Sequence, residues 1–167
     1  MTSDHVTIRP YAAGDAAATL RIFERAVTET ARSRYSEAQV LAWLGGPRDE
    51  AAWHQRRAAA GTVVALVDGE VAGFTDLRDD GYVDMLFVSP DHGRRGIGAR
   101  LLAQVVETAR HDGVPALSTH ASEVARPVFE RAGFAVVERE TVHRGDVTLD
   151  RYVMQRPLDV HGSGETA

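Results

Sequence analysis

The segment from Asp91 to Ala99 reads Asp-His-Gly-Arg-Arg-Gly-Ile-Gly-Ala, and its residue types suit the binding of an anion. It precedes a stretch with helical periodicity, and the first turn of a helix leaves backbone N–H groups unpaired and carries partial positive charge. Glycines let a phosphate approach the backbone closely. Arg94 and Arg95 add charge, and a guanidinium can grip phosphate oxygens with two N–H groups. The sequence therefore predicts a phosphate-binding turn between a strand and a helix.

Three classes of phosphate ligand compete for this turn, and the spacing separates them. A dinucleotide-binding fingerprint requires a third glycine at a position where this chain has Leu101. A Walker-type loop requires a lysine, and all 19 Lys and Arg residues of this chain are arginine. A pyrophosphate-bearing ligand such as coenzyme A remains.

The elements that must hold this turn are predicted from hydrophobic periodicity and from capping residues. Asp15, Ser36 and Asp49 each precede spaced apolar residues and predict helix starts, and Ser36 and Gln39 have the spacing of a capping box. The order of elements gives a mixed sheet with helices on its faces. A later helix is expected to begin at Ser122 or Glu123. The predicted strands cover residues 6–9, 62–67, 71–77, 82–88, 116–119, 134–142 and 147–153.

Composition limits the class of protein. The chain has 167 residues, a formal net charge of -5 and no cysteine, so we expect one folded domain without disulfide, thiolate or iron–sulfur chemistry. The acidic balance argues against a nucleic-acid groove, and no apolar run is long enough to span a bilayer. The histidines lack metal-ligand spacing. We therefore expect no metal, no nucleic-acid or membrane partner, and a cytoplasmic location.

Three stretches of the chain resemble the GNAT superfamily of acyl-CoA-dependent N-acyltransferases. Residues 93–98 match the superfamily's pyrophosphate motif, Gln/Arg-x-x-Gly-x-Gly/Ala, except at its first position. Residues 122–134 resemble the helix before strand six, including its usual final Gly-Phe. Residues 8–11, together with 35–39 and Trp43, resemble a bacterial branch of acetyltransferases whose acceptors are mostly unassigned.

This resemblance covers most of residues 6–156 and implies a fold. It implies one α/β (α+β) domain with the GNAT fold over residues 1–156, in which helices flank a mixed, mostly antiparallel sheet of about seven strands. It also implies that a bulge in strand four splays strands four and five apart, and that the cofactor lies in the resulting cleft. Residues 157–167 have the composition of a disordered tail.

The resemblance further implies acetyl-CoA as the cosubstrate and assigns positions to it. Backbone groups near Phe87 and Val88 are expected to hold the pantetheine arm and to polarise the thioester carbonyl. Ser122 stands where the superfamily carries an Asn that contacts the cofactor. Phe129 stands where it carries a Tyr that protonates the leaving thiolate, and Phe129 has no such proton. The N–H groups expected to cradle the pyrophosphate belong to Arg94, Arg95, Gly96, Ile97, Gly98 and Ala99.

Three polar residues are candidates for accepting the proton of the acceptor amine. Asp84 shares side-chain parity with Tyr82 in the predicted strand, so it can act directly or through a water molecule, or form a structural ion pair instead. Tyr82 stands where some members of the superfamily carry a catalytic Glu. His120 ends the fifth strand beside the expected splay, and a histidine there suits acid–base catalysis. The alternative is a surface histidine without a catalytic role.

The resemblance implies that the first two helices form a wall of the acceptor pocket. Glu29, Tyr35 and Trp43 are the expected lining residues, and Trp43 also suits a helix anchored in the core. Arg56 and Arg57 are expected on a solvated helix face.

The function implied by these motifs is transfer of the acetyl group of acetyl-CoA to a primary amine of a small molecule or peptide. The amine is expected to attack directly, in a monomer or homodimer, so that the protein contributes mainly positioning and oxyanion stabilisation. The alternative is an acyl-CoA-binding regulatory or structural module without catalytic activity, for which Phe129 is the main evidence.

Overall fold

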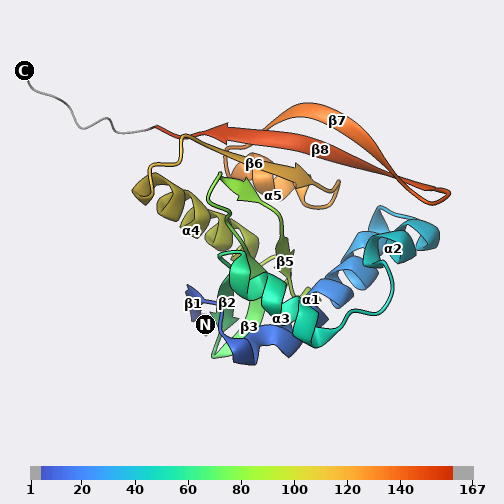
Figure 1. The fold of residues 1–167 in the computed structure, drawn as a ribbon, viewed down its shortest axis with the longest axis horizontal. Coiled ribbons are helices and arrows are strands. Elements are labelled where there is room, and N and C mark those ends of the chain that lie inside the picture. Colours follow the sequence, from blue (N-terminus) through green and yellow to red (C-terminus); the bar gives the residue numbers. More distant parts are fainter. Residues whose placement is uncertain (1–4, 160–167) are drawn as a thin grey trace, which may run out of the picture.

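The strands of the protein form two sheets of four, seen in a computed structural model that describes residues 5–159 (Figure 1). The first sheet is antiparallel and has the strand order β1-β2-β3-β5. The second sheet has the order β4-β6-β8-β7, in which the β4–β6 pair is parallel and the other pairs are antiparallel. The predicted mixed, mostly antiparallel arrangement is therefore confirmed.

The strand bounds agree with most of the predicted ranges. In the first sheet they are β1 (Val6–Pro10), β2 (Val63–Val67), β3 (Glu70–Thr75) and β5 (Leu86–Val88). In the second sheet they are β4 (Tyr82–Val83), β6 (Ala116–Ala121), β7 (Ala135–Arg144) and β8 (Val147–Pro157).

Helices lie beside both sheets, and two of the three predicted helix starts are confirmed by capping. Ser36 Oγ accepts from the Gln39 N–H and the Gln39 side chain accepts from the Ser36 N–H, while Asp49 accepts from two N–H groups of the following turn. The α-helices are α1 (Ala16–Arg25), α2 (Glu37–Leu44), α3 (Glu50–Ala59), α4 (Ile97–His111) and α5 (Arg126–Arg131). The 3-10 turns are Ala13–Asp15, Ala31–Ser33 and Pro90–His92, and a π-helical turn covers Ala26–Thr30. Within the described residues, none of these helices is long and apolar enough to cross a membrane.

Helix α4 packs against both sheets and joins their cores. Near its start, Ile97 and Leu101 belong to an apolar cluster with residues of β2 and β3. Leu102 and Val105, on the neighbouring face, belong to a second cluster with residues of β4, β6 and β8. A third cluster, around Trp53, packs α1 and α3 on the first sheet. Because α4 is shared, the position of its first turn is fixed relative to both sheets.

The predicted strand 82–88 is broken in the structure, and this is the implied bulge. Residues 84 and 85 separate β4, which pairs with β6, from β5, which pairs with β3. The Asp76 carboxylate accepts hydrogen bonds from the Asp84 N–H (2.8 Å) and the Met85 N–H (3.1 Å), and Thr75 Oγ1 donates to the Met85 carbonyl (2.8 Å). Side chains thus form hydrogen bonds with the backbone groups that would pair with a neighbouring strand if the strand were continuous.

The buried carboxylate that holds this break is neutralised by an arginine. Arg57 donates to the other oxygen of Asp76 at 2.9 Å, and the two side chains are 4% and 0% exposed. Burial raises the pKa of Asp76, whereas its backbone donors and Arg57 oppose that change. The expectation of a solvated Arg57 is wrong, because Arg57 follows the buried Trp53 by one helical turn and shares its inward face.

Three further predictions are corrected by the structure. Asp15 accepts from Arg9 (2.7 Å) and from the Ala12 N–H (2.8 Å), so its side chain closes the preceding turn and does not cap α1. Residues 122–125 form a turn, and α5 begins at Arg126. The predicted tail 157–167 starts too early, because Pro157 ends β8 and Leu158 is buried in the core. Residues 160–167 of that tail lie outside the described residues.

Loss of the Asp76 charge is expected to destabilise the broken strand. Asp76→Asn keeps an acceptor oxygen but leaves Arg57 as a buried charge without a counter-ion, and should lower the free energy of unfolding by about 3–5 kcal/mol. Urea unfolding followed by circular dichroism measures this change. Asp79→Asn, at an exposed position of the adjacent loop, is the matched control and should change stability by less than about 0.5 kcal/mol. Equal stability of the two variants would contradict the role given to Asp76.

Candidate active site

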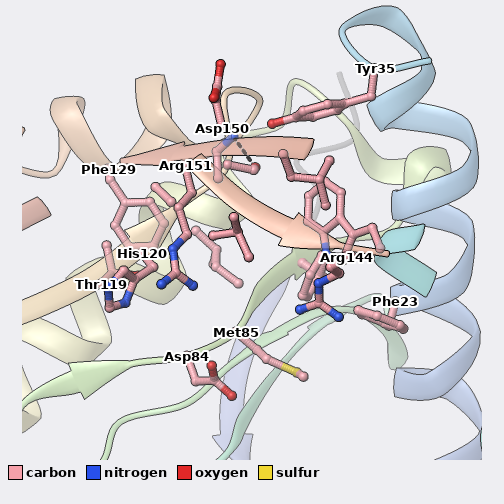
Figure 2. A pocket seen from close by; sticks show the side chains of 18 of the residues that line it. Phe23, Tyr35, Asp84, Met85, Thr119, His120, Phe129, Arg144, Asp150 and Arg151 are labelled. Atoms are coloured by element: carbon pink, nitrogen blue, oxygen red, sulfur yellow. Dashed lines mark hydrogen bonds between the residues drawn. The ribbon is translucent and has the colours of Figure 1, made fainter. Parts of the chain in front are cut away.

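Two cavities meet where β5 diverges from β6. One, of about 270 Å³, is lined from β4, β5, β6, α5 and the β7–β8 hairpin (Figure 2), and the other, of about 480 Å³, extends along β5 to the first turn of α4. We call them the inner cavity and the loop cavity. They share the lining residues Trp43, Leu86, Phe87, Ser122 and Ala125. The splay predicted between strands four and five thus opens one continuous cleft.

The predicted phosphate-binding turn forms one end of the loop cavity. Gly96 precedes α4 in the left-handed conformation, with φ of 74°, and α4 has no side-chain cap, so its first N–H groups face the cavity end without a protein side chain on them. Arg94 also has a left-handed φ of 64° and lines the cavity. Ile97, Gly98 and Ala99 line it too, whereas Arg95 is exposed and lies outside the lining.

The residues of this end fit a pyrophosphate. A Cβ on Gly98 would lie 3.2 Å from Val128 Cγ1 of α5, so the absence of a side chain keeps the space between α4 and α5 open. His92 Nδ1 is buried beside the same cavity without a hydrogen-bond partner among the described residues. An uncapped helix start, a glycine facing the groove and an unsatisfied ring nitrogen together suit an anionic, hydrogen-bonding ligand.

Strand β5 places Phe87 and Val88 along the cleft, as predicted. It is the edge strand of the first sheet, and in an antiparallel pair only alternate backbone groups point to the partner. The remaining N–H and C=O groups of β5 face the cleft, where they can pair with amide groups of a ligand. The Phe87 ring packs on Phe23 of α1, with ring centres 5.0 Å apart, which fixes this wall.

The loop after β6 is tied to the N-terminal helices. The Tyr35 hydroxyl accepts a hydrogen bond from the Glu123 N–H at 2.8 Å, and the Tyr35 ring packs edge-on against Trp43. Ser122 Oγ accepts from the Ala125 N–H (3.1 Å) and lines both cavities. Burial raises the pKa of Tyr35, which keeps its hydroxyl protonated. Tyr35 and Trp43 therefore line the inner cavity, and Tyr35 also holds the opposite wall in place.

Glu29 is placed elsewhere. Its carboxylate accepts from Arg25 at 3.0 Å on the exposed side of the π-helical turn, and Glu29 lines neither cavity. The prediction that it lines the pocket is therefore wrong: Arg25, which also binds Asp91 at 2.8 Å, holds Glu29 at the surface.

Tyr82 and His120 are brought together by the parallel pairing of β4 with β6. The Tyr82 hydroxyl lies 2.7 Å from His120 Nδ1, and both side chains line the inner cavity. His120 Nε2 lies 3.9 Å from Glu140, whose carboxylate accepts from Arg151 at 2.8 Å. Burial raises the pKa of Tyr82. The arrangement is a hydroxyl–imidazole–carboxylate chain that can accept and hold a proton.

Asp84 also lines the inner cavity but lies in a different setting. Its backbone N–H binds Asp76, and its half-exposed carboxylate lies 3.6 Å from Arg78. The predicted alternation of side-chain directions along one strand does not extend through this position, because the strand is interrupted there. Asp84 is thus both the predicted candidate base and a member of a loose ion pair.

Phe129 closes the cleft from α5. Its side chain is 3% exposed, packs edge-on against Phe134 with ring centres 5.1 Å apart, and touches the inner cavity. It offers an apolar surface at the position where a proton donor is expected from the resemblance.

Several cavity residues were not predicted from the sequence. Arg48, Arg144 and Arg151 line the inner cavity and come from the α2–α3 connection and the β7–β8 hairpin. The alternation of β8 carried a signal for Arg151, while nothing local distinguishes Arg48 from other surface arginines. Across the described residues, no group of three or more His, Cys, Asp or Glu side chains is placed to hold a metal ion. The expectation of no metal stays a prediction.

Comparisons with known proteins point to one family. The model of the acetyltransferase (GNAT) domain matches residues 31–150. An uncharacterized N-acetyltransferase of Escherichia coli K12, YafP, is 36% identical over 155 residues, which cover 92% of this chain and 98% of that protein.

Solved structures give the same result for the fold. A GCN5-related N-acetyltransferase from Rhodopseudomonas palustris is 31% identical and superposes with a TM-score of 0.86 over 95% of this chain and 99% of that one. The structure of yncA from Salmonella typhimurium with acetyl-CoA has 23% identity and a TM-score of 0.74, over 98% of this chain and 99% of that chain. The latter similarity concerns the fold alone.

A bulky side chain in the loop cavity is expected to block the ligand. Gly98→Trp places an indole between α4 and α5, so calorimetric titration should show at least a 100-fold loss of coenzyme A affinity, or about 3 kcal/mol. The Val128 contact should cost about 1–3 kcal/mol of stability. Ala103→Trp, at an exposed position of the same helix, is the matched control and should bind normally. Normal affinity in Gly98→Trp would place the cofactor elsewhere.

Proposed function

Since the chain belongs to the GNAT family of acetyl-CoA-dependent N-acetyltransferases, we propose that its cleft moves an acetyl group from acetyl-CoA to a primary amine of a small molecule or peptide. The observation that carries this proposal is the Tyr82–His120 pair, which lines the inner cavity, and that cavity shares its wall at Phe87 and Ser122 with the loop cavity. Both cavities are lined by one chain, so the proposal is compatible with a monomer or a homodimer.

The loop cavity would hold the cosubstrate. Backbone N–H groups of the first turn of α4, together with Arg94, would bind the pyrophosphate, and the free edge of β5 at Phe87 and Val88 would pair with the pantetheine amides. Ser122 would contact the arm where the two cavities meet. Acetyl-CoA supplies an acyl carbon that is activated as a thioester. The same β5 edge would direct a backbone N–H at the thioester oxygen and so stabilise its developing negative charge.

The transfer needs one bond made and one broken. The neutral amine nitrogen bonds to the acyl carbon, the carbon–sulfur bond breaks, and its electron pair leaves on sulfur. The amine nitrogen loses one proton and the thiolate gains one. No covalent bond to the protein is required, so positioning and electrostatic stabilisation supply the rate enhancement.

Tyr82 and His120 would accept the proton from the amine. The raised pKa of Tyr82 keeps its hydroxyl protonated, so the hydroxyl can take up the amine proton while passing its own to His120 Nδ1, 2.7 Å away. Glu140, 3.9 Å from Nε2, stabilises the imidazolium that results. Asp84 is the competing base, and its carboxylate lies 3.6 Å from Arg78.

Phe129 would pack against the acyl end of the cosubstrate without giving a proton to the thiolate. Coenzyme A thiolate is a moderately good leaving group, so solvent can protonate it after the carbon–sulfur bond has broken. The alternative of a binding module without catalysis has Phe129 as its specific support. Transfer of labelled acetyl groups from acetyl-CoA to any amine would exclude that alternative.

The proton relay predicts a loss of turnover when either of its members is replaced. His120→Gln should lower kcat by about 100-fold. Tyr82→Phe should lower kcat as well but leave coenzyme A affinity unchanged. Initial rates of thiol release measure kcat, and calorimetric titration measures the affinity for coenzyme A.

Two variants separate this relay from its alternatives. His143→Gln, at an exposed position of β7, is the matched control and should keep the wild-type kcat. If Asp84→Asn lowers kcat by about 100-fold and His120→Gln does not, then Asp84 is the base and the relay is wrong.

A further inference from the structure

We infer that the acceptor is a small primary amine that also carries an anionic group, a carboxylate, phosphate or phosphonate, bound by Arg48 and Arg144 in the inner cavity. This inference rests on the proposed function and names its substrate class. It depends on two arginines that the transfer step does not use and on the way the acidic side chains around them are paired.

Arg48 is held against the aromatic floor of the cavity. Its guanidinium carbon lies 4.5 Å from the centre of the Phe23 ring, and one terminal nitrogen donates to the Leu44 carbonyl at 3.3 Å. Its Nε is buried without a hydrogen-bond partner in the described part of the chain. A stacked guanidinium is already ordered, so it loses little further freedom when it binds an anion.

Arg144 adds a second positive charge to the same cavity. It ends β7, and Figure 2 shows its side chain directed into the pocket together with that of Arg151. Within residues 5–159 its side chain makes neither a hydrogen bond nor an ion pair. Burial lowers the pKa of Arg48, and the charges of Arg56 and Arg144 lower it further, while Glu24 acts in the opposite direction. The two arginines therefore face one cavity without a direct counter-ion.

The acidic side chains of this region are already bound to other arginines. Asp150 accepts from Arg139 at 2.6 Å, Glu140 accepts from Arg151 at 2.8 Å, and Asp84 lies 3.6 Å from Arg78. None of the acids that the structure describes forms an ion pair with Arg48 or Arg144. An anion on the acceptor would supply the missing counter-charge, and charge-assisted bonds to arginine are strong in a partly buried site.

The phosphates of the cosubstrate do not account for these arginines. Arg48 and Arg144 line the inner cavity and are absent from the loop cavity, whose own arginines are Arg94 and Arg131. The same two charges would repel a second ammonium group on the acceptor, so they also discriminate against diamines and polyamines.

Matched amines that differ only in their second group test this inference. One set is 4-aminobutanoate, 4-amino-1-butanol and 1,4-diaminobutane, and further sets vary the chain from two to five carbons and include aminoalkylphosphonates. Initial rates of thiol release from acetyl-CoA are measured with the full chain, which contains no cysteine and so adds no background thiol. The anionic member of a set should exceed the neutral member in kcat/KM by about 10- to 100-fold, with the diamine lowest.

Arginine variants identify the side chains responsible. Arg144→Gln should remove most of the advantage of the anionic amine over the neutral amine, through KM. Arg48→Gln should act in the same direction. Arg21→Gln, which removes an equal charge from an exposed position of α1, is the matched control and should keep the full preference.

The outcomes separate this inference from the proposed function. Equal kcat/KM for anionic and neutral amines, or a preference for diamines, would overturn the anionic acceptor while transfer itself stands. If no amine is acetylated, the proposed function fails. Calorimetric titration of amines into the coenzyme A-loaded protein then tests the anion-binding subsite by itself. Binding of 3-aminopropylphosphonate but not 3-amino-1-propanol, lost in Arg144→Gln, would still support the subsite, whereas equal or absent binding would overturn it.

Discussion

The buried carboxylate of Asp76 stabilises the interruption between β4 and β5, and the whole site is built around this interruption. Asp76 accepts the N–H groups of residues 84 and 85 and is neutralised by Arg57, so the chain can leave one sheet and enter the other without unpaired backbone groups at these positions. β4 then pairs with β6 and β5 pairs with β3. Without the hydrogen bonds of the Asp76 side chain, β4 and β5 would continue as one strand, and the sheet would close the cleft.

The second constraint is the shared helix α4. Ile97 and Leu101 pack on one sheet, while Leu102 and Val105 pack on the other, so the helix cannot follow either sheet independently. Its first turn is thereby held at the mouth of the cleft that the broken strand creates. The left-handed Gly96 lets the chain enter the helix there with its first N–H groups directed at the loop cavity. One arrangement of two sheets and one helix thus positions both the predicted phosphate-binding turn and the cleft between the sheets.

Local signals in the sequence predicted most of the elements, and long-range contacts account for what was missed. Ser36 and Asp49 act within a few residues, so capping and periodicity were sufficient for them. The loop from Arg94 to Ala99 was recognisable for the same reason.

Asp76 and Arg57 lie 19 residues apart, and their pairing depends on how α3 packs against β3. Tyr82 and His120 were separate candidates in the sequence, and only the β4–β6 register makes them a pair. Glu29 was misplaced because Arg25 holds it at the surface.

The charge of the cleft shows why bulk composition describes a protein's partners poorly. The chain has a formal net charge of -5, which on its own favours cationic ligands. Yet Asp150 and Glu140, beside the inner cavity, are paired with Arg139 and Arg151, so neither acid is the counter-ion of Arg48 or Arg144. Arg48 and Arg144 are not paired in this way, and a field from unpaired charges at contact distance outweighs a screened surface average. The sign of the ligand follows from which charges are left over inside the cavity, and here those charges are positive.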